Sequence, residues 1–142
     1  GYGGYCFPKD TNQLRAEYDS IPQKLVGAIV EANQTRIDFL SQKIIERADG
    51  GVIGIYRLLM KARSDNIRSS ATMRLVERLT ELGAQMILFE PLLECSLSKT
   101  VKLIGSLTQF KEKSDLIVAN RVSPEITDVL DKTFTRDIFN EN

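Results

Sequence analysis

The 142-residue sequence contains no histidine and no tryptophan, and only two cysteines, Cys6 and Cys95. Without histidine, a Cys–His catalytic pair is excluded within this chain. The two cysteines lie far apart and lack the spacing of metal ligands, so we expect neither a metal site nor a disulfide between them. Any reactive thiol here must be activated by a local field, by a carboxylate or by another part of the protein.

An excess of one charge and long apolar runs are also missing. Nineteen basic residues balance nineteen acidic ones, so no overall basic field attracts nucleic acid or an anionic membrane. No apolar run approaches the roughly 20 residues that span a bilayer, and the first residues do not resemble a signal peptide. We therefore expect a soluble, cytoplasmic protein that binds neither nucleic acid nor membrane, and whose anion-binding sites are local.

The most informative segment is glycine-rich and opens the chain, with the sequence GYGGYCFPKD. Glycines let the backbone approach a ligand closely, and Pro8 suits the first turn of a helix, so Cys6 is predicted to lie just ahead of a helix N-terminus. The helix dipole and Lys9 favour the thiolate form, and Asp10 is a potential proton acceptor. A lone cysteine is usually a small buried hydrophobic residue, but this combination favours a nucleophile.

Two helices are predicted in the first third of the chain. The first runs from Pro8 to about Tyr18, and a long one runs from Gln23 to about Ala48, with Ser20 as its cap. Pro22 is placed in the first turn of the long helix. The apolar surface of the long helix comprises Val26, Val30, Ile37, Leu40 and Ile44, widened by Leu25, Ile29 and Ala32. This surface is too broad for a helix that only rests on a sheet, which leaves a core helix or a spine between domains that also forms a dimer interface.

Beyond Asp49 the pattern changes to short apolar runs that alternate with helical segments. Strands are predicted at residues 52–56, 85–89, 102–104, 116–119 and 132–135, and helices at 70–82, 107–113 and 124–131. The alternation predicts an α/β fold, in which a long central helix precedes a Rossmann-like, mainly parallel sheet with helices on both faces. We expect two parts, a cysteine loop with its central helix at residues 1–49 and an α/β domain at residues 50–142.

Two polar segments follow predicted strands, at the edge of such a sheet where ligands collect. Residues 61–70 read KARSDNIRSS, and their basic and hydroxyl side chains at a helix start suit a phosphate. The alternative is a solvated loop with Ser69 as the helix cap. Arg136 follows the last predicted strand, where the alternative is a surface ion pair with Asp137.

These motifs together resemble the UDP-glucose/GDP-mannose dehydrogenase family over nearly the whole chain. The opening GYGGYCFPKD resembles the family's catalytic cysteine loop. Lys61, Asp65 and Arg68 match its Phe-Lys-x-x-x-Asp-Asp-x-Arg-x-Ser segment. Three positions depart from the family pattern, namely Met60, Asn66 and Ala71. These departures leave Lys61 and Arg68 in place, but they leave the subfamily and the substrate preference open.

The resemblance implies an enzyme that uses NAD to oxidise the C6 alcohol of a sugar nucleotide to a carboxylate. Two hydride transfers would pass through a cysteine thiohemiacetal and a thioester. Cys6 would be the nucleophile, and Asp10 would position or activate the hydrolytic water. The implied ligand contacts are Gly3, Lys61 and Arg136 for the UDP-sugar, and Lys9 and Arg68 for NAD.

Intact members of this family carry an N-terminal NAD-binding domain with a Gly-x-Gly-x-x-Gly turn, and the sequence has no such turn between a strand and a helix. We therefore expect the C-terminal portion of a longer dehydrogenase, inactive alone, that forms a homodimer through the central helix. UDP-glucose is the expected substrate, and GDP-mannose or a UDP-N-acetylhexosamine is the alternative. A noncatalytic nucleotide-binding or dimerisation module is the alternative from another functional class.

Overall fold

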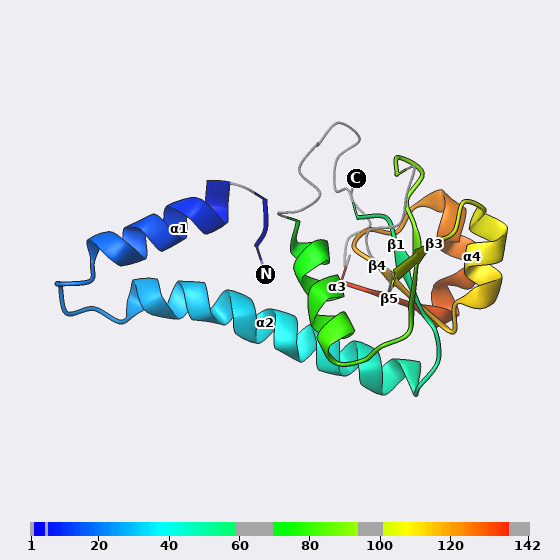
Figure 1. The fold of residues 1–142 in the computed structure, drawn as a ribbon, viewed down its shortest axis with the longest axis horizontal. Coiled ribbons are helices and arrows are strands. Elements are labelled where there is room, and N and C mark those ends of the chain that lie inside the picture. Colours follow the sequence, from blue (N-terminus) through cyan, green and yellow to red (C-terminus); the bar gives the residue numbers. More distant parts are fainter. Residues whose placement is uncertain (1, 5, 59–69, 94–100, 137–142) are drawn as a thin grey trace.

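The computed structural model describes residues 2–4, 6–58, 70–93 and 101–136. Helix α1 (Cys6–Glu17) and the first half of helix α2 (Leu25–Ala48) form an antiparallel hairpin that projects from a sheet domain (Figure 1). The sheet domain contains, in chain order, β1 (Ile53–Tyr56), α3 (Ala71–Glu81), β2 (Met86–Phe89), β3 (Val101–Leu103), α4 (Leu107–Lys113), β4 (Leu116–Ala119), the 3-10 helix η2 (Pro124–Lys132) and β5 (Thr133–Thr135).

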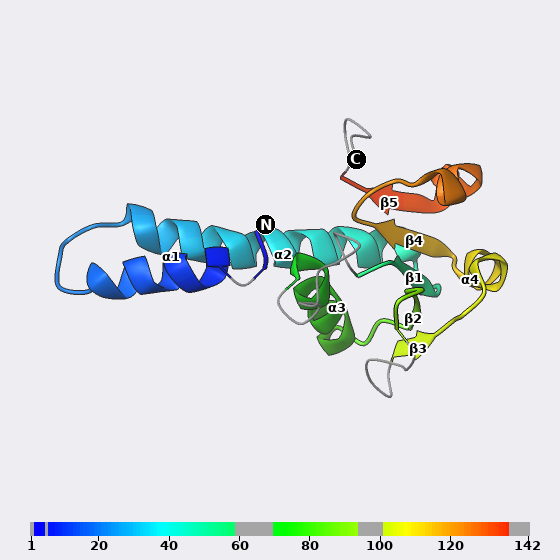
Figure 2. The same ribbon diagram turned by 90° about the horizontal axis from the view of Figure 1, so that it is seen from above.

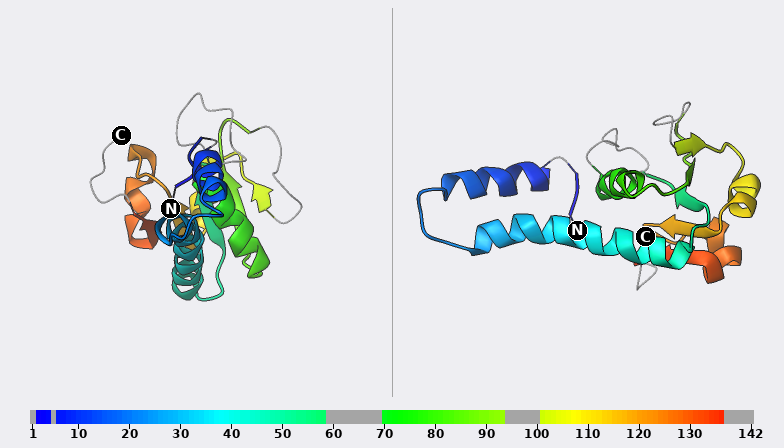
Figure 3. Two further views of the ribbon diagram at one scale, coloured as in Figure 1. Left: turned by 90° about the vertical axis from the view of Figure 1, so that its left-hand side faces the viewer. Right: turned by 60° about the horizontal axis from the view of Figure 1, so that its bottom comes forward.

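The five described strands form one sheet in the order β3-β2-β1-β4-β5, and every neighbouring pair is parallel. Helices α2 and α3 cover one face, where Ile44 and Val76 pack against Ile55. Helices α4 and η2 cover the other face, where Phe110 and Ile126 share a cluster with strand residues (Figures 2 and 3). The predicted α/β fold, with a parallel sheet between two layers of helices, is confirmed.

A glycine in the central strand brings α4 close to the sheet. Gly54 lies between Ile53 and Ile55, whose side chains join the core cluster on the α2 and α3 side. A Cβ atom on Gly54 would lie 2.1 Å from Ser114 Oγ and 2.8 Å from the Phe110 ring. The missing side chain therefore makes room for the fully buried Phe110.

The start of α2 differs from the prediction. The helix begins at Leu25, and Gln23 Oε1 accepts a hydrogen bond from Val26 N at 2.9 Å. Ser20 and Pro22 lie in the connection before the helix. The prediction that Ser20 caps this helix and Pro22 enters its first turn was wrong, because the Gln23 amide satisfies a free N–H of the first turn instead.

The buried face of α2 is narrower and more polar than the predicted apolar surface. Its buried residues are Asn33, Ile37, Ser41, Ile44 and Ala48. By contrast, Leu25 is 73% exposed and Ile29 is 42% exposed. Only the second half of the helix packs on the sheet, which explains the difference. Among the described residues, no helix combines the length and apolar character needed to cross a membrane.

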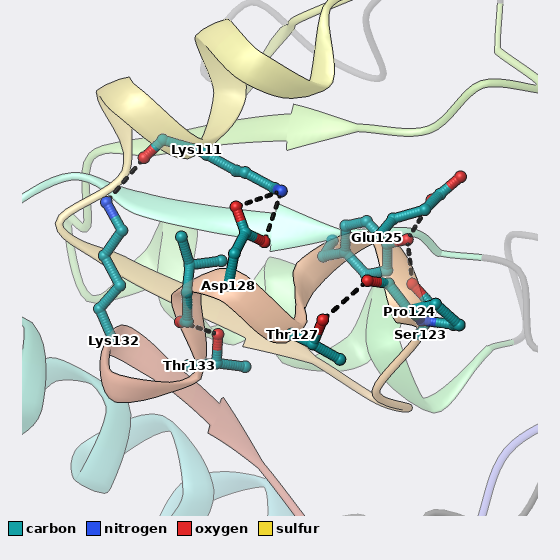
Figure 4. A network of polar contacts seen from close by, with 10 residues as sticks. Lys111, Ser123, Pro124, Glu125, Thr127, Asp128, Lys132 and Thr133 are labelled. Carbon is teal, nitrogen blue, oxygen red and sulfur yellow. Dashed lines mark hydrogen bonds and ion pairs between the residues drawn. The ribbon is translucent and has the colours of Figure 1, made fainter.

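Polar contacts hold η2 against α4 and against the start of β5 (Figure 4). Lys111 Nζ lies 2.6 and 2.8 Å from the two carboxylate oxygens of Asp128, and this hydrogen bonding lowers the pKa of Asp128 below its ordinary value of 3.8. Lys132 Nζ donates to the carbonyls of Lys111 and Ser114, at 2.7 and 2.8 Å, at the end of α4. Satisfying these free carbonyls fixes the chain immediately before β5.

We predict opposite effects of alanine at two glycines. Gly54→Ala lowers the free energy of unfolding by about 1–3 kcal/mol, because the added methyl group overpacks the interface with α4. Gly27→Ala raises it by about 0.5–1 kcal/mol, because helical glycine is unfavourable and no described atom lies within 4 Å of the added Cβ. Urea denaturation of both variants measures the difference, and equal effects would contradict the packing described here.

Candidate functional site

We call residues 2–4 together with Cys6 the cysteine loop, and α1 begins at Cys6. The thiol thus lies in the first turn of α1, whereas the sequence predicted that it lies just ahead of a helix that starts at Pro8. Cys6 is exposed. Asp10 is four residues further on, which places both side chains on one face of the helix. Lys9 Nζ lies 3.1 Å from Asp10 Oδ1, and more than half of each side chain is exposed.

The buried amide of Asn33, in the middle of α2, holds this loop. Tyr2 N donates to Asn33 Oδ1 at 2.8 Å, and Asn33 Nδ2 donates to Tyr2 O at 2.9 Å. Asn33 is only 5% exposed. Sequence analysis missed this residue, although a polar side chain one turn before Ile37 on an apolar helix face was an available signal.

Gly3 packs against the start of α3. A Cβ atom on Gly3 would lie 2.4 Å from Ala71 N and 3.0 Å from its Cα, both of which are backbone atoms. Only glycine allows this close approach. The prediction that Gly3 brings backbone amides to a sugar nucleotide stays a prediction, whereas its packing on α3 is a structural role that the sequence did not indicate.

A cleft of about 260 Å³ lies at the carboxyl ends of β4 and β5, between the first turn of α3 and the middle of α2. Its polar lining residues are Arg36, Thr72, Asn120, Thr135 and Arg136. The guanidinium of Arg136 lies 5.6 Å from the centre of the Phe134 ring. Arg136 is thus located at the ligand edge of the sheet, as expected for a residue that follows the last strand. Its alternative partner, Asp137, lies outside the described residues.

The segment between β1 and α3 carries two further predicted ligand residues, Lys61 and Arg68. Both lie outside the described residues, as does Cys95. Ser70 precedes α3, and its Oγ accepts a hydrogen bond from Met73 N at 3.0 Å and caps the helix. The interpretation of Ser69 as the cap was therefore wrong by one residue.

A second polar cluster, which the sequence did not reveal, joins the end of β1 to η2. The Tyr56 hydroxyl lies 2.6 Å from Ser123 Oγ and donates to Glu125 Oε2 at 2.7 Å, and Arg57 Nη2 donates to the same oxygen at 2.8 Å. Arg57 has a φ of 58°. Burial raises the pKa of Tyr56 above its ordinary value of 10.0, and Glu125 reinforces the shift. The phenol therefore keeps its proton at neutral pH and donates a hydrogen bond to Glu125.

Glu90 follows β2 and fixes the backbone where the β1–α3 segment begins. The side chain is buried, with an exposed fraction of 4%. Glu90 Oε2 accepts from Leu58 N at 2.9 Å, and Oε1 accepts from Leu92 N at 3.3 Å. An acidic residue directly after an apolar strand was the sequence signal for it. Across the described ranges, no group of three or more His, Cys, Asp or Glu residues is arranged to hold a metal ion.

Comparison with known proteins places this geometry in a family. Residues 54–141 match the family described as "UDP-glucose/GDP-mannose dehydrogenase family, UDP binding domain". UDP-glucose 6-dehydrogenase from Streptococcus pneumoniae is 45% identical over 139 residues, which is 98% of this chain and 35% of that protein. The enzyme of the same name from Campylobacter jejuni is 41% identical over 141 residues, which is 98% of this chain and 36% of that protein. The chain thus spans about a third of the length of these relatives.

Solved structures share the fold at lower identity. A GDP-mannose dehydrogenase from Pseudomonas aeruginosa superposes with a TM-score of 0.74 at 19% identity, covering 96% of this chain and 36% of that one. A UDP-glucose dehydrogenase from Pyrobaculum islandicum gives 0.71 at 20% identity, covering 96% and 31%. Because the family match covers most of the chain and includes the sheet and its ligand edge, the chain belongs to the UDP-glucose/GDP-mannose dehydrogenase family, with a UDP binding domain at residues 54–141.

Proposed function

We propose that this chain is the C-terminal third of an NAD-dependent UDP-glucose 6-dehydrogenase, which oxidises UDP-glucose to UDP-glucuronate. The observation that carries the proposal is the identity of 45% and 41% to two proteins of that name over 98% of the chain. The geometry supports it as well, because the loop that carries Cys6 and the cleft at the sheet edge both contact Ala71.

The UDP part of the substrate is proposed to bind in the cleft at the carboxyl ends of β4 and β5. Arg36 and Arg136 supply positive charge, and arginine binds phosphate oxygens in a bidentate manner. Thr72 belongs to the first turn of α3 and also lines the cleft, so the positive end of that helix favours an anion there. Lys61 is assigned to the UDP-sugar as well, and the backbone of Gly3 to its sugar portion.

Cys6 is proposed to attack the C6 aldehyde once the first hydride has left the C6 alcohol. The resulting thiohemiacetal loses a second hydride and becomes a thioester, which water hydrolyses to the carboxylate and the free thiol. Asp10, on the same helix face as Cys6, would position that water or accept its proton. The exposure of Cys6 supports this role, because a nucleophile must be accessible to its substrate.

Two molecules of NAD would accept the two hydrides, one hydride each. The residues of this chain fit a partial contact with NAD, since Lys9 is exposed and belongs to the same helical turn as Cys6. Lys9 would approach the cofactor, and Arg68 would contact the pyrophosphate. The rest of the cofactor site would belong to an N-terminal NAD-binding domain.

Residues 1–49 and 50–142 are proposed to act as two parts, and the protein to form a homodimer through α2. Exposed apolar side chains on the α1–α2 hairpin support the dimer, namely Leu14, Tyr18, Ile21, Leu25 and Ile29. Burial of such a patch between two copies would remove apolar surface from water and stabilise the assembly.

The first test measures UDP binding to the 142-residue chain by isothermal titration calorimetry. We expect Arg136→Gln to weaken binding by about tenfold or more, because a charge-assisted hydrogen bond to phosphate is lost. Arg15→Gln makes the same change on α1, away from the cleft, and should leave the affinity unaltered. Equal affinities for wild type and Arg136→Gln would refute the assignment of Arg136.

The second test concerns the nucleophile, in a full-length dehydrogenase that carries this chain. Cys6→Ser should lower UDP-glucuronate formation by more than about a thousandfold, as loss of a covalent nucleophile does elsewhere. Cys95→Ser should retain activity. Normal product formation by Cys6→Ser would exclude the covalent route. Assays of UDP-glucose, GDP-mannose and a UDP-N-acetylhexosamine side by side would test the substrate.

The third test concerns the assembly state, measured by sedimentation velocity. The double variant Leu25→Lys/Ile29→Lys should sediment as a monomer, because two charges would have to be buried unpaired in the interface. Leu82→Lys changes a similarly exposed leucine at the end of α3 and should remain a dimer. A dimeric double variant would show that the α1–α2 hairpin is not the interface.

A further inference from the structure

The cysteine loop is anchored to α2 through both backbone groups of one residue. Tyr2 N donates to Asn33 Oδ1 at 2.8 Å, and Tyr2 O accepts from Asn33 Nδ2 at 2.9 Å. The amide thus pairs with Tyr2 much as a neighbouring strand would. Because Asn33 is only 5% exposed, water competes little for these bonds, and their loss would leave buried polar groups unsatisfied.

Tyr2 also anchors the first turns of α1. The Tyr2 hydroxyl lies 3.1 Å from Thr11 Oγ1, which donates to the Phe7 carbonyl at 2.7 Å. The Tyr2 and Phe7 rings lie 6.4 Å apart between centroids. The backbone of Tyr2 is therefore bound to α2, and its side chain contacts the helical turns that follow Cys6.

Helices α2 and α3 support the cysteine loop and also line the cleft at the sheet edge. Gly3 lies directly against the backbone of Ala71, and Ala71 lines the cleft at the sheet edge. Ile37, one helical turn beyond Asn33 on the buried face of α2, lines the same cleft. The position of the loop relative to the cleft is consequently set by two helices that contribute to both.

We infer that Asn33 is a positioning residue, which holds Tyr2 so that Cys6 stays at a set distance from a sugar nucleotide in the cleft. The inference rests on the proposed roles of Cys6 and of the cleft. Gly3 and Gly4 allow many backbone conformations ahead of Cys6, and a reacting atom must be held close to its partner for efficient reaction. Asn33 restricts the loop without touching the substrate.

The test uses Asn33→Asp, which keeps the size of the side chain and the Oδ1 acceptor but replaces the Nδ2 donor by an oxygen facing Tyr2 O. In the full-length dehydrogenase we expect kcat to fall by about tenfold or more, while KM for UDP-glucose changes less than about twofold, because the cleft is intact. Gln42→Glu makes the same chemical change at an exposed position of α2 and should leave both constants unaltered.

A second readout is independent of the chemistry. Hydrogen exchange of the Tyr2 amide, followed by NMR in the 142-residue chain, should accelerate by about tenfold or more in Asn33→Asp and not in Gln42→Glu. An unchanged exchange rate, or a loss of UDP affinity equal to the loss of kcat, would overturn the positioning role. Wild-type enzyme that binds UDP-glucose without oxidising it would refute the proposed function, and the exchange rate would still decide whether Asn33 holds the loop.

Discussion

The structure depends on one helix, α2, which packs against the sheet domain at one end and supports the cysteine loop at its middle. Near its C-terminus the contact is apolar, through Ile44 and Ala48. At its middle the contact is polar, through the Asn33 amide. Since a helix is rigid over this length, the two contacts place the loop and the ligand edge of the sheet in one frame. Burial provides the stability of that frame, and the hydrogen bonds provide its specificity.

The ligand edge is itself held by buried or half-buried polar groups. Glu90 fixes the backbone after β1, and Tyr56 connects that strand to Glu125 in η2. At the opposite edge, where β4 and β5 begin, Lys132 ties the end of η2 to the end of α4. Parallel strands end at the same edge of a sheet, so the connections that follow them crowd together and can build one site. Arg136, which follows β5, lines the cleft at the carboxyl edge.

The fold was predictable because parallel strands buried on both faces form short continuous apolar runs. The strand at 116–119 and the helix at 107–113 have the bounds expected from the sequence. Capping was harder to predict, since Gln23 rather than Ser20 satisfies the start of α2. The exposure of Leu25 also escaped prediction, because an apolar side chain on a helix does not reveal whether its own chain covers it.

Local patterns thus determined the order of the elements, the parallel sheet, the presence of a helix next to Cys6 and the place of Arg136 after the last strand. The spacing of apolar residues and the positions of glycine and proline carry that information, because each affects the backbone over only a few residues. Only the tertiary structure brought Asn33 to Tyr2, Gly3 to Ala71 and Tyr56 to Glu125. These partners are separated by 31 residues or more along the chain, and no local preference specifies which amide meets which backbone. Packing of the helices on the sheet made that choice.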